Sequence, residues 1–183
     1  TYGVRELQPS GYFQGGQLVG SAGGIIPNAD AIKQIIIGSG TSAIRYDFYE
    51  LLPAALTGRV WSDPDMGCVF NEGDAPLAGV TIELLDGNGI VISAKLTDDN
   101  GFYRFEGLEP GKLYAVRERQ PNGYSQGGTL VGSSGGAVLQ DDLIGQITLD
   151  SNEFANNYDF CEIPTSALSG YVFQDGPAIT LLP

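Results

Sequence analysis

The sequence repeats itself with an offset of 112 residues (114 − 2). Residues 2–12, which read YGVRELQPSGY, return at residues 114–124 as YAVRERQPNGY. The match continues without a gap to residues 56–60 and 168–172, and about half of the aligned positions are identical. A period of this length is typical of domain-sized units in tandem, not of a solenoid built from small repeats.

The period predicts how the 183 residues are organised. Residues 1–55 are expected to be the C-terminal part of a first repeat, 56–167 a complete repeat, and 168–183 the first strand of a third. The complete repeat is long enough to bury a core of its own. The chain would then be a section of a longer array, and arrays of similar domains usually serve as spacers, stalks or fibres.

The formal net charge of −13 limits the partners of the chain. Nucleic-acid binding needs clustered Lys and Arg, and anionic membrane surfaces attract basic segments, so we expect neither partner. No apolar run reaches the length of a transmembrane helix. The charge suits a self-repelling surface protein or one that binds cations, and simple solubility is the alternative interpretation.

Short apolar runs separated by turn residues indicate an all-β chain. In the complete repeat the expected strands are residues 56–61, 79–85, 90–96, 102–105, 113–118, 144–149 and 157–160. Residues 86–89 (DGNG) and 98–101 (DDNG) carry hairpin signals. Seven strands at this spacing are typical of a sandwich with Greek-key links. The predicted core residues are Val60, Val80, Ile82, Leu84, Phe105, Tyr114, Val116, Ile147, Leu149, Tyr158 and Phe160.

Residues 126–140 are expected to form a long Gly-rich loop. Five of its glycines recur in the first repeat, at positions 15, 16, 20, 23 and 24. This recurrence predicts a required backbone path, with positive φ or a close approach, and a flexible binding loop is the alternative. The join between repeats, residues 162–167, is short and contains Pro164, so neighbouring domains are expected to meet at a restricted angle.

Several motifs resemble a known family. Residues 58–63 (GRVWSD), 79–82 (GVTI), 97–118 (TDDNGFYRFEGLEPGKLYAVRE) and 121–124 (PNGY) are similar to the SdrD B-like branch of the Cna B-type domains. Residues 157–162 (NYDFCE) and 172–177 (VFQDGP) resemble the variant that is repeated in very large planctomycete surface proteins. The resemblance covers essentially the whole chain. It implies tandem Ig-like (prealbumin-like) β-sandwich domains, a structural role and an extracellular location on a bacterium.

Residues 63–74 (DPDMGCVFNEGD) have the spacing of an EF-type calcium loop. The predicted ligands are Asp63, Asp65, Asn71, Asp74 and the carbonyl of Val69. The family that the chain resembles carries a calcium loop in this place. Gly67 departs from the pattern where an oxygen ligand is usual, and Cys68 stands where the turn usually has Gly. The alternative is an acidic loop that no longer binds calcium.

Cys68 and Cys161 are the two cysteines, and the sequence contains no His, so a zinc site of ordinary composition cannot form. In an Ig-like sandwich the first and last strands can run parallel and side by side, which would place both cysteines at the same end of the domain. We therefore expect an intradomain disulfide, which fits an oxidising, extracellular setting. Two separate thiols, or pairing between chains of a fibre, are the alternatives.

Catalysis is not expected. Residues 132–136 (GSSGG) match a nucleophile-elbow pattern, but no His can act as base, and the first repeat has Ala22 in the nucleophile position. Glu118 and its mate Glu6 match the Glu that assists isopeptide formation in some Cna B-type domains, yet Arg59 stands where that chemistry needs Lys. We instead expect an inward Glu118 that bonds backbone donors or an Arg.

The sequence thus predicts a structural tandem-repeat module of an extracellular bacterial surface protein, acting as a stalk, a spacer or a subunit of a self-assembling filament. Its expected partners are neighbouring repeats or further copies of the chain in a fibre, and calcium is its expected cofactor. The alternative function is a ligand-binding adhesin module that uses the Gly-rich loop.

Overall fold

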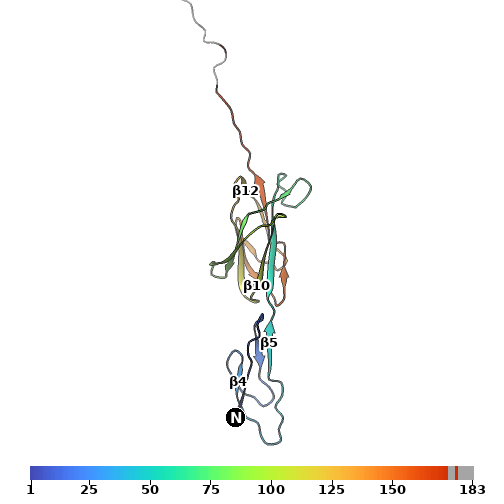
Figure 1. Cartoon of the computed structure of the whole chain (residues 1–183), viewed down its shortest axis with the longest axis vertical. Helices are drawn as coiled ribbons and strands as arrows, with labels where there is room; N and C mark the ends of the chain where they lie inside the picture. Colours follow the sequence, from blue (N-terminus) through green and yellow to red (C-terminus); the bar gives the residue numbers. More distant parts are fainter. Residues whose placement is uncertain (173–175, 177–183) are drawn as a thin grey trace, which may run out of the picture.

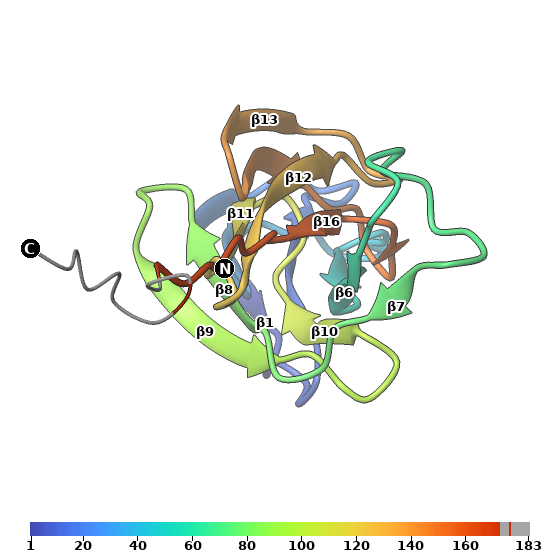
Figure 2. The same cartoon turned by 90° about the horizontal axis from the view of Figure 1, so that it is seen from above.

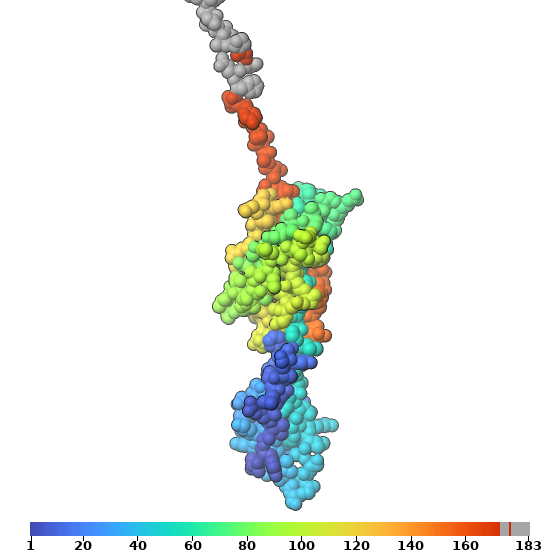
Figure 3. All heavy atoms as spheres, viewed as in Figure 1, coloured from blue at the N-terminus to red at the C-terminus, as the bar shows by residue number. Residues whose placement is uncertain are grey.

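The structure, a computed structural model, describes residues 1–172 and residue 176. All regular secondary structure in this part of the chain is β-strand. These residues therefore form no helix that could cross a membrane. The molecule is elongated, with the N-terminal strands at one end, a sandwich in the middle, and the segment after the last strand leaving at the opposite end (Figure 1). The N-terminal part and the sandwich meet at a narrow junction (Figure 3).

Two sheets form the sandwich, and their strands surround a common interior (Figure 2). The first sheet contains β6 (Ala54–Ser62), β7 (Ala75–Pro76), β10 (Phe102–Leu108), β12 (Tyr124–Leu130), β15 (Phe154–Ala155) and β16 (Asp159–Pro164). The second sheet contains β8 (Thr81–Asp86), β9 (Val91–Leu96), β11 (Leu113–Glu118), β13 (Ala137–Gln140) and β14 (Leu143–Thr148). The predicted all-β, Ig-like sandwich is therefore confirmed for the middle of the chain.

The predicted core is also confirmed. All eleven residues expected in the core are buried, and each is at most 6% exposed. The reason is visible in β11, where Tyr114, Val116 and Glu118 are buried while the residues between them are more exposed, as the period-two geometry of a strand requires. Side chains from both sheets contribute to this one cluster.

Two expectations about connections are wrong. Residues 98–101 do not close a hairpin, because β9 pairs with β8 while β10 pairs with β6, so this turn carries the chain from one sheet to the other. The Gly-rich segment is not mainly a loop, because it contains most of β12 and all of β13, and β12 pairs with β16. Its glycines permit this path: a side chain at Gly128 would lie 2.7 Å from the Cys68 sulfur, and Gly136 has a φ of 113°.

The first and last strands of the sandwich run parallel and side by side, as predicted. Phe160 lies opposite Val60, and Cys161 lies opposite Trp61. The chain therefore enters the sandwich at the beginning of β6 and leaves it at the far end of β16 (Figure 1). This arrangement places everything that follows β6 and β16 at one end of the domain.

The N-terminal strands are β1 (Tyr2–Arg5), β2 (Phe13–Leu18), β3 (Ile25–Asn28), β4 (Ala31–Ile35) and β5 (Asp47–Leu51). They pair in the order β1-β4-β3 and β2-β5. The strands that match them in sequence, β11, β14, β13, β12 and β16, pair in the same way. The division into residues 1–55, 56–167 and 168–183 stays a prediction. Residues 168–172 are exposed and belong to no strand, and residues 173–175 and 177–183 lie outside the described residues.

Replacing Leu149 by Ala tests the assignment of strand faces. Leu149 directly follows β14 and is fully buried, so the truncation should lower the free energy of unfolding by about 2–4 kcal/mol. Thr148→Ala, on the exposed face, should change it by less than about 0.5 kcal/mol. Urea unfolding measures both. A small effect of Leu149→Ala together with a large effect of Thr148→Ala would show that the faces are assigned backwards.

Candidate functional site

The loop that follows β6 gathers three of the five predicted calcium ligands. Asp63 is fully buried at the end of the strand, and its backbone N–H donates to the carbonyl of Glu162 in β16 at 2.7 Å. Carboxylate oxygens of Asp63, Asp65 and Asp74 all lie within 4.8 Å of one another. An oxygen-only group of this kind is what a calcium ion prefers.

Hydrogen bonds hold this loop in place. The Asn71 amide donates to Asp65 Oδ2 at 3.1 Å, and the Asn71 backbone N–H donates to Asp74 Oδ2 at 2.8 Å. Contact with the Asp63 carboxyl, then with Asn71 and with the Gly67 N–H, lowers the pKa of Asp65. The Val69 side chain is exposed, and no described contact involves its carbonyl, so the predicted fifth ligand stays a prediction.

Cys68 occupies the turn position where such loops usually have Gly. Its φ is 49°, in the left-handed region that Gly adopts most easily. The backbone N–H of Cys68 donates to Asp63 Oδ2 at 2.6 Å, and its sulfur is bonded to Cys161. Cys68 therefore adopts the backbone conformation that Gly usually provides at this turn. Its disulfide also attaches the turn to β16.

The Cys68–Cys161 disulfide is the one predicted from the sequence. Its cysteines are separated by 93 residues, and their Cα atoms lie 5.5 Å apart. It closes a long loop, which is where a covalent link removes most entropy from the unfolded chain. The bridge joins the loop after the first strand to the last strand, beside the candidate calcium ligands.

A second group of carboxylates lies inside the same end of the sandwich. Glu118 ends β11, Asp142 lies in the turn between β13 and β14, and Glu162 lies in β16, so the group joins both sheets. One oxygen from each of the three residues lies within 4.8 Å of the others. Glu118 and Glu162 are buried, whereas Asp142 is half-buried. Sequence reasoning found only Glu118.

The expectation that Glu118 bonds backbone donors or an Arg is wrong. Its side chain is 2% exposed, as expected for an inward position. However, no hydrogen-bond donor among the described residues reaches either of its carboxylate oxygens. The carboxyl of Glu162 contacts Glu118, and these two acceptors can hydrogen-bond only when one of them carries a proton. Burial, followed by the charges of Glu162 and Asp142, raises the pKa of Glu118 to about 10. Burial likewise raises the pKa of Glu162 to about 7.

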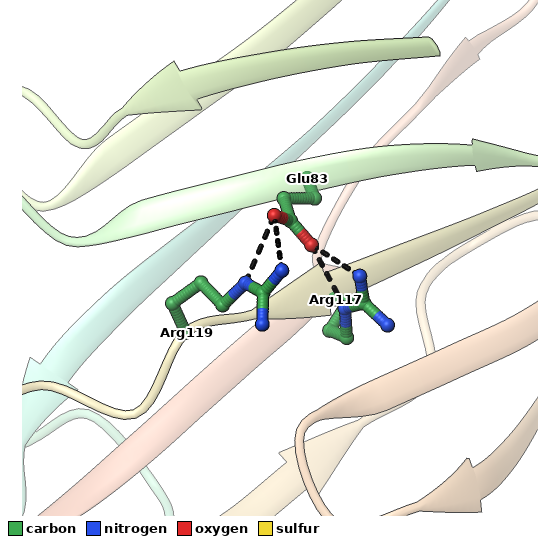
Figure 4. A network of polar contacts seen from close by, with 3 residues as sticks. All are labelled: Glu83, Arg117 and Arg119. Atoms are coloured by element: carbon green, nitrogen blue, oxygen red, sulfur yellow. Dashed lines mark hydrogen bonds and ion pairs between the residues drawn. The ribbon is translucent and has the colours of Figure 1, made fainter. Parts of the chain in front are cut away.

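Glu83 shows how the same protein neutralises another buried carboxylate. The guanidinium groups of Arg117 and Arg119 form ion pairs with its two carboxylate oxygens, at N···O distances of 2.6–2.9 Å (Figure 4). Burial alone would raise the pKa of Glu83, but hydrogen bonds from Arg119 and Arg117 outweigh it and lower the pKa. This pairing links β8 to β11 and its following residues, and it gives both carboxylate oxygens of Glu83 a cationic partner.

The N-terminal strands contain a matching carboxylate group. Glu6, Asp30 and Glu50 also place one oxygen each within 4.8 Å of the others, and they are the repeat mates of Glu118, Asp142 and Glu162. These three residues are half-buried rather than buried. Burial, then the charges of Glu50 and Asp30, raises the pKa of Glu6. The same arrangement therefore occurs twice in the chain.

A groove of about 920 Å³ lies over β6 and β10, on the face of the sheet that points away from the core. The guanidinium of Arg59 lies 4.4 Å from the ring centre of Phe70 and 4.1 Å from that of Phe102, a favourable cation–π arrangement. Trp61 also lines the groove, and its indole N–H has no partner among the described residues. From the Gly-rich segment, Leu130 contributes to the lining.

Comparison with known proteins places these features in a family. The model of the SdrD B-like domain matches residues 54–161. Serine-aspartate repeat-containing protein D of Staphylococcus aureus (strain Newman) is 29% identical over 180 residues, covering 96% of this chain and 13% of that protein. A fibrinogen-binding protein of Staphylococcus epidermidis is 29% identical over 126 residues, covering 69% of this chain and 11% of that protein. The chain therefore spans a small share of either relative's length.

Among solved structures, the minor pilin GBS52 of Streptococcus agalactiae is 18% identical and has a TM-score of 0.43, covering 77% of this chain and 61% of that chain. The relatives found by sequence are cell-surface proteins, and the chain is an extracellular segment of this kind, in agreement with its disulfide. Because the family model matches more than half of its length, the chain belongs to the SdrD B-like domain family.

Proposed function

We propose that the chain is a load-bearing spacer in an extracellular stalk or fibre, built from SdrD B-like repeats in tandem. The observation that carries this proposal is the parallel pairing of β6 with β16. Tension enters at the beginning of β6 and leaves at the end of β16. Because these strands lie side by side, pulling along their length loads their hydrogen bonds together rather than one after another.

The connection between the N-terminal part and the sandwich supports the same role. Leu52 and Pro53 alone separate β5 from β6. The Leu52 N–H donates to the Ser151 hydroxyl at 2.9 Å, and its carbonyl accepts from the Asn152 N–H at 3.2 Å. A short connection that contains Pro and is hydrogen-bonded to the next unit restricts the angle between the two parts.

The partners in this proposal are neighbouring repeats of the same protein, or further copies of it in a fibre. A ligand-binding adhesin module that uses the Gly-rich segment is the lower-ranked alternative. Part of that segment packs closely against the residues before β16, since a Cβ at Gly132 would overlap the Asn156 carbonyl oxygen. The rest of the segment is half-buried or exposed. A spacer role requires no catalytic group, and the proposal assigns none.

A calcium ion in the loop of residues 63–74 would strengthen such a spacer, and we include it in the proposal. Support comes from the converging oxygens of Asp63, Asp65 and Asp74. Asp74 Oδ1 is buried without a partner in the described part of the chain, so a ligand position is available. The ion would fix the loop that the disulfide attaches to β16.

Distances between spin labels test the stiffness of the connection. With nitroxides on Lys33→Cys in β4 and Ser125→Cys in β12, both exposed sites, electron–electron double resonance in calcium buffer should give one narrow distance distribution. A matched protein with a short Gly-Ser insertion between Leu52 and Pro53 should give a broad one. If the uninterrupted protein is as broad as the insertion variant, the two parts move independently and the spacer proposal fails.

Counting bound ions by native mass spectrometry tests the calcium loop. Asp63→Ala removes a buried ligand and should lower the number of calcium ions by one, while also reducing the thermal stabilisation that calcium gives by mass action. Glu72→Ala, an exposed carboxylate in the same loop, should leave the number unchanged. An unchanged count in Asp63→Ala would remove calcium from this loop.

A further inference from the structure

Among the described residues, the carboxylate group formed by Glu118, Asp142 and Glu162 lacks the cationic partners that stabilise the buried carboxylate of Glu83. Glu83 has two Arg partners (Figure 4). In the described part of the chain, no Lys or Arg forms an ion pair with the three residues of the group. Buried carboxylates are unfavourable unless a cation pairs with them or they bind protons.

The buried atoms of this group that lack a hydrogen-bond partner are all carboxylate oxygens, which can bind a metal ion. Both oxygens of Glu118, one of Glu162 and one of Asp142 are buried without a hydrogen-bond partner among the described residues. Glu118 is 2% exposed and Glu162 is fully buried, so water cannot satisfy them freely. The Gln120 amide donates to the other oxygen of Glu162, which orients this carboxylate but brings no positive charge.

A neutral oxygen lies on the same side of the sheet. Gln126 is directly opposite Glu162 in the β12–β16 register, so the two side chains face the same way. The amide nitrogen of Gln126 donates to Thr129 at 2.9 Å, while its amide oxygen is buried without a described partner. The donor set is therefore carboxylate and amide oxygen, with no nitrogen or sulfur ligand.

The N-terminal strands repeat this set residue by residue. The five residues Glu118, Gln120, Gln126, Asp142 and Glu162 are matched by Glu6, Gln8, Gln14, Asp30 and Glu50. Two contacts recur as well: the backbone N–H of each first Glu donates to the carbonyl of its Asp at 2.9 Å, and each first Gln donates to the last Glu. About half of the aligned positions differ between the repeats, yet none of these five does.

We propose that Glu118, Asp142 and Glu162 bind a divalent cation of the calcium type, and that Glu6, Asp30 and Glu50 form a second site of the same design. Calcium binds oxygens at about 2.3–2.6 Å, so oxygens on opposite sides of the ion lie about 4.8 Å apart. The three carboxylates satisfy this limit without backbone movement. The half-buried Asp142 provides access from solvent.

The ion would join the two sheets where the chain leaves the sandwich. Glu118 and Asp142 belong to the second sheet and its turn, and Glu162 belongs to the last strand of the first sheet. In the N-terminal part the corresponding Glu50 lies two residues before Leu52, at the connection to β6. Each site would thus fix the end of one unit beside the beginning of the next. The site does not depend on the spacer proposal or on the loop of residues 63–74.

Native mass spectrometry of the full chain with calcium alone tests the proposal. All proteins carry Asp63→Ala, which removes the loop ligand and leaves only the sites proposed here. This background should bind two calcium ions, Glu118→Gln should bind one, and Glu118→Gln with Glu6→Gln should bind none. Glu106→Gln, a matched change of an exposed carboxylate, should still bind two. Calcium should raise the melting temperature of the background more than that of Glu118→Gln.

Protonation of the group in place of metal binding predicts a different result. The background would then bind no calcium, and Glu118→Gln would raise the melting temperature equally with calcium and with chelator. That result, or an equal number of ions in the background and in Glu118→Gln, would overturn the proposal. If Glu118→Gln fails to fold by circular dichroism, Asp142→Asn at the solvent side of the group replaces it, with the same expected loss of one ion.

Discussion

The parallel contact between β6 and β16 is the constraint on which the rest of the structure depends. It brings the beginning of the repeat beside its end although residues 60 and 160 are far apart in sequence. The disulfide, the loop of residues 63–74 and the group around Glu162 all lie where these strands finish. Cys161 is bonded to Cys68 in the loop of residues 63–74, whereas the next residue, Glu162, lies beside Glu118 inside the sandwich. Neighbouring side chains of a strand point to opposite faces in this way.

Local sequence pattern was sufficient to predict the core, whereas the disulfide was predicted from the parallel first and last strands expected of an Ig-like sandwich. The alternation around Val80–Leu84 and Tyr114–Val116 marks inward positions, and all of these predicted residues are buried. The Gly-rich segment was misjudged because β12 has no apolar alternation. Its pairing with β16 is decided by contacts such as that of Gly128 with the two cysteines, which exist only in the folded chain. The prediction of a hairpin at residues 98–101 was wrong for a related reason, since the residues of a turn do not reveal which sheet the next strand joins.

The carboxylate group illustrates a different limit. Glu118 is visible from strand alternation, but Asp142 and Glu162 approach it only through the pairing of β14 and the packing of the two sheets. An informative signal was nonetheless present in the sequence: Glu6, Asp30 and Glu50 recur at the same offset as these three residues. Identical polar residues at inward or turn positions of both repeats are an economical indication of a shared site. By contrast, Cys161 has Tyr49 as its mate, so the disulfide belongs to one repeat alone.

Stretching single molecules from their two ends tests most directly whether the β6–β16 contact bears the load. With the disulfide intact, rupture of the sandwich should release only the chain outside the 93-residue separation of Cys68 and Cys161. After reduction, the account predicts one distinct rupture peak followed by a lengthening that is greater by roughly 300 Å. Equal lengthening in both states, or gradual extension of the reduced molecule without a rupture peak, would contradict it.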